Sequence, residues 1–142
     1  MSGLQAKRIV VPVDFSDMSF DAVDKALQIV DPAGAVHLIH VLPNLPAMEY
    51  GNLYGTVTDK SRIEQVTKHL REKLSDEKYA ATTIHVLIGD AGRQITQFAE
   101  SEKADMIVIP SHGYGFLKHI LLGSVAERVV RLAHCPVLVL RS

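Results

Sequence analysis

The sequence contains few of the features that mark secreted, membrane-bound or strongly charged proteins. Its single cysteine, Cys135, cannot form an intramolecular disulfide, and no surrounding motif would lower the pKa of this thiol, so we expect it to be unreactive. No apolar run is long enough to span a bilayer, and residues 1–8 lack the apolar core of a signal peptide. Lys and Arg number 15 against 16 Asp and Glu, so no net field attracts nucleic acid or membrane. These absences predict a cytoplasmic protein with no nucleic-acid or membrane partner.

The motifs of several familiar active sites are also missing. No Gly-Lys-Ser/Thr run provides a Walker-type phosphate loop, and Gly113–Lys118 lacks the third glycine of a dinucleotide fingerprint. No Ser or Cys nucleophile has a recognisable His and orienting acid, so we assign no catalytic residues and expect slow ATP hydrolysis at most. His37 and His40 are three residues apart in an expected strand and therefore point to opposite faces. We expect no dedicated protein metal site.

The 142 residues do contain a regular alternation of short apolar runs and helical repeats. The apolar runs predict five strands, at residues 8–14, 35–42, 82–88, 106–109 and 135–141. Apolar residues at helical spacing predict four helices between them, the first ended by Asp31–Gly34. Pro110 is expected to end the fourth strand. The alternation predicts a single α/β domain over residues 1–142, built on a parallel sheet.

The loop that follows the fourth predicted strand is the strongest candidate for a binding site. Ligands of open parallel sheets bind beyond the carboxyl ends of the strands. Gly123 and Ser124 lead into a helix with Val125, Val129 and Leu132 on its expected inner side. A helix N-terminus attracts anions, glycine lets the backbone approach a phosphate, and Ser124 can cap the helix and donate its hydroxyl. The spacing is equally consistent with an ordinary strand-to-helix connection.

Gly113, nine residues, Gly123 and Ser124 resemble the nucleotide loop of the universal stress protein family. Its ATP-binding members carry Gly, two residues, Gly, nine residues, Gly, and then Ser or Thr. Other segments that match the family are Ile9–Asp14, His40–Val41, Gly89, Asp105–Gly113 and Cys135–Val139. The resemblance implies a Rossmann-like, adenine nucleotide alpha hydrolase-like fold: one open five-stranded parallel sheet of order 3-2-1-4-5 with helices on both faces. It also implies a homodimer formed through the C-terminal strand.

The resemblance assigns expected roles to particular residues. Pro12 and Asp14 would lie along adenine and ribose, and the backbone of Val41 would meet adenine. The phosphates would be held by Gly113, Gly123, Ser124 and Val125, with Ser111 and His112 nearby. A Mg²⁺ ion held mainly by the phosphates, with help from Asp14, is favoured over a dedicated metal site.

One position departs from the family pattern. Pro110 replaces the first glycine, which removes an N–H donor and fixes φ. We still expect adenine-nucleotide binding, of ATP or shifted toward AMP or ADP. The leading hypothesis is a small dimeric nucleotide-binding stress sensor or adaptor with unidentified protein partners.

Two alternatives stay open. In the first, a nucleotide-free dimeric interaction module, Pro110 has inactivated the site, and the apolar loop and Val137–Leu140 contact proteins. The second, a hydrolase or phosphatase acting on nucleotides, is disfavoured because a base–nucleophile pair is missing.

Overall fold

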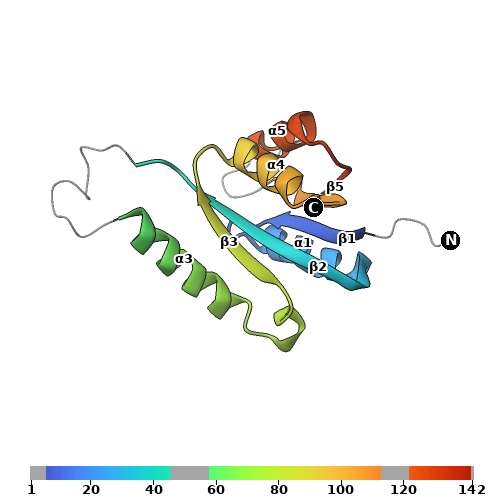
Figure 1. Ribbon diagram of the computed structural model, residues 1–142, viewed down its shortest axis with the longest axis horizontal. Helices are drawn as coiled ribbons and strands as arrows, with labels where there is room; N and C mark the ends of the chain where they lie inside the picture. Colours follow the sequence, from blue (N-terminus) through green and yellow to red (C-terminus); the bar gives the residue numbers. More distant parts are fainter. Residues whose placement is uncertain (1–5, 46–57, 113–121, 142) are drawn as a thin grey trace.

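The structure is a computed structural model that describes residues 6–45, 58–112 and 122–141. Five parallel strands form one sheet in the order β3-β2-β1-β4-β5 (Figure 1), which confirms the predicted fold class. The elements in chain order are β1 Ala6–Pro12, α1 Asp17–Ile29, β2 Val30–Leu42, α3 Asp59–Lys73, the 3₁₀ turn Glu77–Tyr79, β3 Thr83–Ile88, α4 Ala91–Ser101, β4 Met106–Pro110, α5 Ser124–Leu132 and β5 Val137–Leu140.

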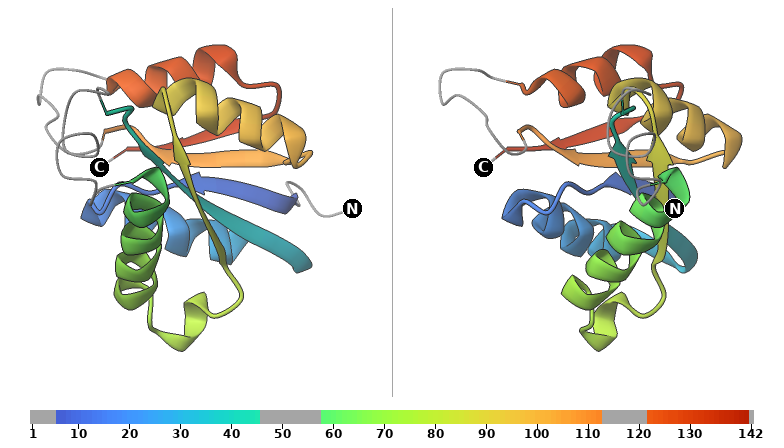
Figure 2. Two further views of the ribbon diagram at one scale, coloured as in Figure 1. Left: turned by 60° about the vertical axis from the view of Figure 1, so that its left-hand side comes forward. Right: turned by 90° about the vertical axis from the view of Figure 1, so that its left-hand side faces the viewer.

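The two faces of the sheet bury separate cores. Helices α1 and α3 cover one face, and α4 and α5 cover the other (Figure 2). Because successive residues of a strand point to opposite faces, Ile9 and Val11 of β1 enter the first core and Val10 enters the second. All five residues of β4 are buried, since this strand has a neighbour on each side and helices on both faces. The predicted placement of helices on both faces is therefore confirmed.

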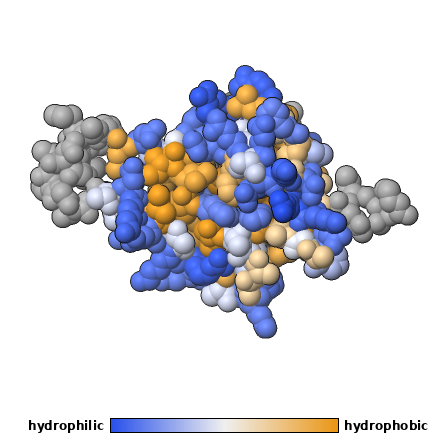
Figure 3. All heavy atoms as spheres, in the orientation of Figure 1, coloured by the Kyte–Doolittle hydropathy of each residue, from blue (hydrophilic) through white to orange (hydrophobic). Residues whose placement is uncertain are grey.

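Strand β3 forms one edge of the sheet. Of its six residues only Val86 is buried, and Thr83 is exposed. Figure 3 looks toward this edge and shows apolar side chains gathered between α3 and α4. The opposite edge is β5, whose four residues are all partly exposed. Each edge strand leaves backbone groups available for pairing with another chain.

The start of β2 differs from the prediction. Asp31–Gly34, expected to be a turn that ends the first helix, lies within the strand, which begins at Val30. The register with β1 shifts between the pairs Ala6–Val30 and Arg8–Ala35, so the pairing of the two strands is irregular there. A Cβ atom added to Gly34 would lie 2.4 Å from the carbonyl oxygen of Lys7. Glycine is needed there because of that close approach.

Helix α5 buries a different face from the one predicted. Ala126 and Val129 are buried, whereas Val125 and Leu132 are 38% and 37% exposed. The expected inner side was therefore wrong at two of its three positions. The N-cap is Gly123, which has no side chain to form a cap hydrogen bond, so the prediction that Ser124 caps the helix was also wrong. Ser124 is the first helical residue.

Candidate functional site

A cavity of about 690 Å³ lies at the carboxyl ends of β1, β2 and β4, beside the N-terminus of α5. Open parallel sheets bind their ligands at this position, where the winding direction changes. The cavity contains every described residue that the sequence singled out, namely Pro12, Asp14, Val41, Ser111, His112, Gly123, Ser124 and Val125. Gly113, the remaining candidate, lies outside the described residues. Residues distant in sequence thus meet at one place.

The cavity exists because β1 and β4 separate toward their carboxyl ends. Their paired residues are Ile9 with Met106 and Val10 with Ile107. Pro12 instead pairs with Ile39 of β2, and Pro110 pairs with Leu140 of β5. Adjacent strands that part in this way leave a crevice between their ends.

Pro110 is the last residue of β4, one position later than the predicted end of the strand. The amides of Ile107 and Ser111 donate to carbonyl oxygens on the β5 side, Pro136 O at 2.9 Å and Leu140 O at 2.8 Å. Because N–H groups alternate sides along a strand, an amide at position 110 would face β1, where the two strands no longer pair. The proline therefore removes no hydrogen bond between β4 and a neighbouring strand. It does remove a donor on the side where the crevice opens.

The N-terminus of α5 faces the cavity. The Gly123 amide donates to Ser111 O at 2.7 Å, which fixes the start of the helix against the end of β4. A Cβ atom added to Gly123 would lie 3.3 Å from Ser111 O, so a larger residue has little room. The first amides of a helix lack intrahelical acceptors, and the helix dipole makes this end positive. The arrangement suits an anionic group.

Asp14 is fixed by the turn that leads into α1. Its Oδ1 accepts hydrogen bonds from the amide of Ser16, at 3.0 Å, and from the Ser16 hydroxyl. Ser16 Oγ in turn accepts from the Ser19 amide at 3.2 Å and caps α1. Phe15, between them, has a φ of 68°, a conformation unfavourable for a bulky residue. Its ring packs edge-on against His40, which helps to hold this conformation.

Two of the described histidines border the cavity. His112 is 8% exposed, and its Nδ1 lies 3.2 Å from the hydroxyl of buried Ser111. His40 Nδ1 lies 2.6 Å from the carbonyl oxygen of Val13. Both rings therefore have protein partners that set their orientation, as buried polar groups require.

An ion pair connects α4 to α5. Asp90 caps α4 by accepting from the Arg93 amide at 3.0 Å, and it also contacts Arg128 of α5 at 3.3 Å. A Cβ atom on Gly92 would come within 2.7 Å of Arg128 Cβ, so the two helices pack closely. The Arg128 side chain is 39% exposed and is paired with a carboxylate on another helix. Spacing along one helix cannot reveal a partner on another.

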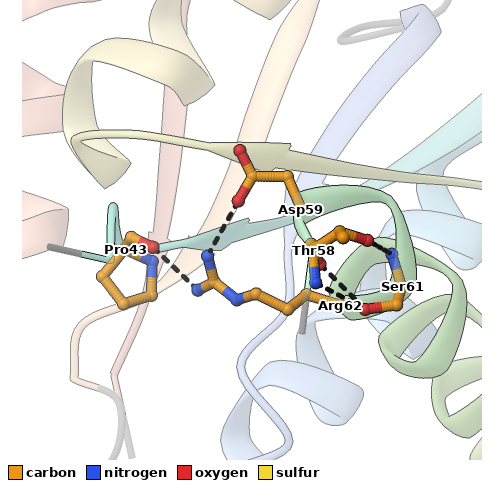
Figure 4. A network of polar contacts seen from close by, with 5 residues as sticks. All are labelled: Pro43, Thr58, Asp59, Ser61 and Arg62. Atoms are coloured by element: carbon orange, nitrogen blue, oxygen red, sulfur yellow. Dashed lines mark hydrogen bonds and ion pairs between the residues drawn. The ribbon is translucent and has the colours of Figure 1, made fainter. Parts of the chain in front are cut away.

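Arg62 ties the end of β2 to the start of α3. Its guanidinium donates to Pro43 O at 2.7 Å and contacts Asp59 at 3.4 Å (Figure 4). Thr58 and Ser61 form a reciprocal capping box at the same helix end. These contacts join Pro43, one residue after the strand that carries Val41, to the first turn of α3.

Three further observations concern metal ligands, membrane-spanning helices and the reactivity of Cys135. Within residues 6–45, 58–112 and 122–141, no three His, Cys, Asp or Glu side chains are grouped to hold a metal ion. In the same ranges, no helix combines the length and apolarity needed to cross a bilayer. Burial, with the nearby Asp105 carboxylate, raises the pKa of the Cys135 thiol. That direction agrees with the expected unreactive cysteine.

Comparison with known proteins finds similar chains. The sequence model described as "Universal stress protein family" matches residues 5–141. Universal stress protein MJ0531 of Methanocaldococcus jannaschii is 37% identical over 141 residues, which cover 95% of this chain and 82% of the relative. The solved structure of MJ0577 from the same organism has a TM-score of 0.77 at 29% identity, with 96% of each chain covered. A universal stress protein in complex with cAMP has a TM-score of 0.66 at 21% identity, covering 96% of this chain and 97% of that one.

Proposed function

Since the chain belongs to the universal stress protein family, we propose that its cavity binds an adenine nucleotide, ATP or AMP/ADP. One observation carries this proposal: a single cavity contains every described residue that the family pattern places at the nucleotide. Its volume of about 690 Å³ lies within the usual range of small-molecule sites. cAMP, the ligand of one structural neighbour, is also an adenine nucleotide.

The proposed orientation follows from the chemistry of the lining. Apolar Pro12 and Val41 border the side where adenine would stack, and the carboxylate of Asp14 can accept hydrogen bonds from ribose hydroxyls. The phosphates would meet the N-terminus of α5, where the backbone of Gly123 permits close approach and the Ser124 hydroxyl can donate. Asp14 fits a Mg²⁺ ion held chiefly by phosphate oxygens.

We assign the protein the role of a dimeric stress sensor or adaptor in the cytoplasm, and not that of an efficient enzyme. A second copy pairing with β5 would cover that exposed edge. Val130 and Leu132 of α5, each more than a third exposed, add apolar surface for protein contacts. The nucleotide would bias which partners the dimer binds.

The first experiment identifies any bound nucleotide. Freshly purified protein is denatured, released nucleotides are identified by mass spectrometry, and the emptied protein is titrated with ATP, ADP and AMP. We expect about one nucleotide per chain. Gly123→Leu should abolish binding because its side chain meets Ser111 O, whereas Gly123→Ala, which requires only a small shift, should retain most of it. Normal binding by folded Gly123→Leu would contradict the assignment of the phosphate position.

Pro110 favours a second candidate, the nucleotide-free dimeric interaction module. A proline at this position removes a donor on the side of the crevice. Pro110→Gly restores that donor without breaking a ladder hydrogen bond. Nucleotide binding by Pro110→Gly but not by the natural chain would favour the second candidate. Equal binding by both would favour the first.

A further inference from the structure

Two histidines and a threonine meet on the sheet, away from the cavity. In the parallel register of β2 and β3, His37 pairs with Thr83, and Ile39 pairs with His85. Nδ1 of His37 lies 3.2 Å from Nε2 of His85. The hydroxyl oxygen of Thr83 lies 2.8 Å from the first nitrogen and 3.3 Å from the second. These contacts are hydrogen bonds whose donors depend on the tautomers of the two rings, and they bring three potential ligand atoms together on two neighbouring strands.

The distance between the two nitrogens suits a shared metal ion. A zinc–nitrogen bond is about 2.0–2.1 Å long, so two nitrogens bound to one ion at right or tetrahedral angles lie about 2.9–3.4 Å apart. Imidazole is a preferred ligand of Zn²⁺, Cu²⁺ and Ni²⁺. We infer that His37 and His85 chelate one divalent transition-metal ion, with the Thr83 hydroxyl beside it and water completing the coordination.

Neighbouring groups prepare the two rings for this role. Phe98 of α4 packs against both, with its ring centroid 6.1 Å from that of His37 and 4.6 Å from that of His85. Neutral imidazoles are the form that binds metal. Each ring would keep its proton on its other nitrogen, Nε2 of His37 and Nδ1 of His85.

The site is open and separate from the proposed nucleotide position. Thr83 is exposed and both histidines are partly exposed, so an ion can enter from solvent. Only two imidazoles contribute, and an exchangeable ion is therefore expected in place of a permanent structural one. Along β2, His37 precedes Val41 by four residues, or about 13 Å at the usual rise per strand residue. The inference is independent of the proposed function.

The test is a Zn²⁺ titration of full-length protein from which metals have been removed with a chelator. Calorimetry should show one ion per chain, and Zn²⁺ should raise the melting temperature. His37→Gln and His85→Gln should each weaken binding at least about tenfold, and the double variant should be little weaker than either, since one loss already breaks the chelate. Thr83→Val should have a smaller effect. The matched control is His134→Gln, an exposed histidine paired with Glu100, which should bind as the natural chain does.

A second measurement covers the case in which the variants fold poorly. Nitrogen-detected NMR of the natural chain should show Zn²⁺ shifting Nδ1 of His37 and Nε2 of His85 and leaving His134 unchanged. Absence of one-to-one binding would overturn the inference. So would undiminished binding by folded His85→Gln, or zinc-induced shifts confined to other histidines.

Discussion

Helices α1 and α5 both begin beside the cavity, but their first turns are completed in different ways. At α1 the Ser16 hydroxyl accepts a hydrogen bond from the Ser19 amide, and Asp14 holds Ser16 in place. Helices α3 and α4 are also capped by side chains, from Thr58 and Asp90. At α5 the N-cap residue is Gly123, which has no side chain to cap the helix.

The difference distinguishes the N-terminus of α1, which is capped by its own side chains, from the N-terminus of α5, which is suited to a ligand. A side-chain cap satisfies an amide that would otherwise need an outside partner, and it stabilises the helix by about 0.5–2 kcal/mol. Helix α5 lacks this stabilisation at the point where the cavity opens. On the proposed function, the phosphates of a nucleotide supply the missing acceptors.

The largest expected effect is a loss of nucleotide affinity in a variant that gives α5 a side-chain cap like that of α1. Gly123→Asp would supply both a capping oxygen and a negative charge where the phosphates are proposed to lie. Nucleotide affinity should fall on the order of 100-fold because of charge repulsion and lost amide donors. The new cap should offset part of the stability that is lost where the added Cβ meets Ser111 O. Calorimetric titration with ATP and urea unfolding measure the two effects.

Gly123→Asn is the matched control for that variant, since it offers a cap without the charge. It should weaken binding less than Gly123→Asp does. If both variants bind ATP as the natural chain does, the first turn of α5 does not hold the phosphates, and the contrast with α1 has no functional meaning.

The second prediction removes the cap of α1. Ser16→Ala deletes a buried hydroxyl that contacts both the Ser19 amide and Asp14. We expect a loss of about 1–2 kcal/mol in the free energy of unfolding. ATP affinity should fall less than in Gly123→Asp, because Asp14 loses part of its support but stays in place. A stability loss near zero would show that the α1 cap is dispensable.

The sequence was informative where local pattern determines structure. The strands and the positions of the helices follow from apolar runs and helical spacing. The residues around the cavity were assigned from the family resemblance. The 3-2-1-4-5 order came from the family resemblance and is confirmed. The alternation of predicted strands and helices would not by itself have determined the order of the strands in the sheet.

Contacts between distant elements could not be predicted in this way. The neighbour of His37 is His85 on the next strand, and Arg128 pairs with Asp90 on another helix. The spacing of Val125, Val129 and Leu132 fits a buried stripe, yet α5 turns Ala126 and Val129 inward. The elements that a helix packs against determine how it is rotated about its axis. The periodicity of its own sequence contains no information about those elements.

The third prediction separates the two contacts of Asp90. Asp90→Ala removes both the α4 cap and the ion pair with Arg128, and should cost about 1 kcal/mol of stability. Asp90→Asn keeps a capping oxygen and removes only the charge. Because both partners of the ion pair are substantially exposed, this variant should lose less than about 0.5 kcal/mol. Equal losses in urea unfolding would mean that the ion pair, and not the cap, matters at α4.

The smallest loss of stability is expected when the N-terminal cap of α3 is removed. Thr58 accepts from the Ser61 amide at 3.0 Å, but this helix end is exposed, and Ser61 Oγ also bonds to the Thr58 backbone. Thr58→Ala should therefore cost only about 0.5 kcal/mol, because water can replace the lost acceptor. Urea unfolding beside Ser16→Ala measures the difference. A loss at Thr58 as large as that at Ser16 would mean that burial and the link to Asp14 add nothing at α1, and that its cap acts on the helix alone.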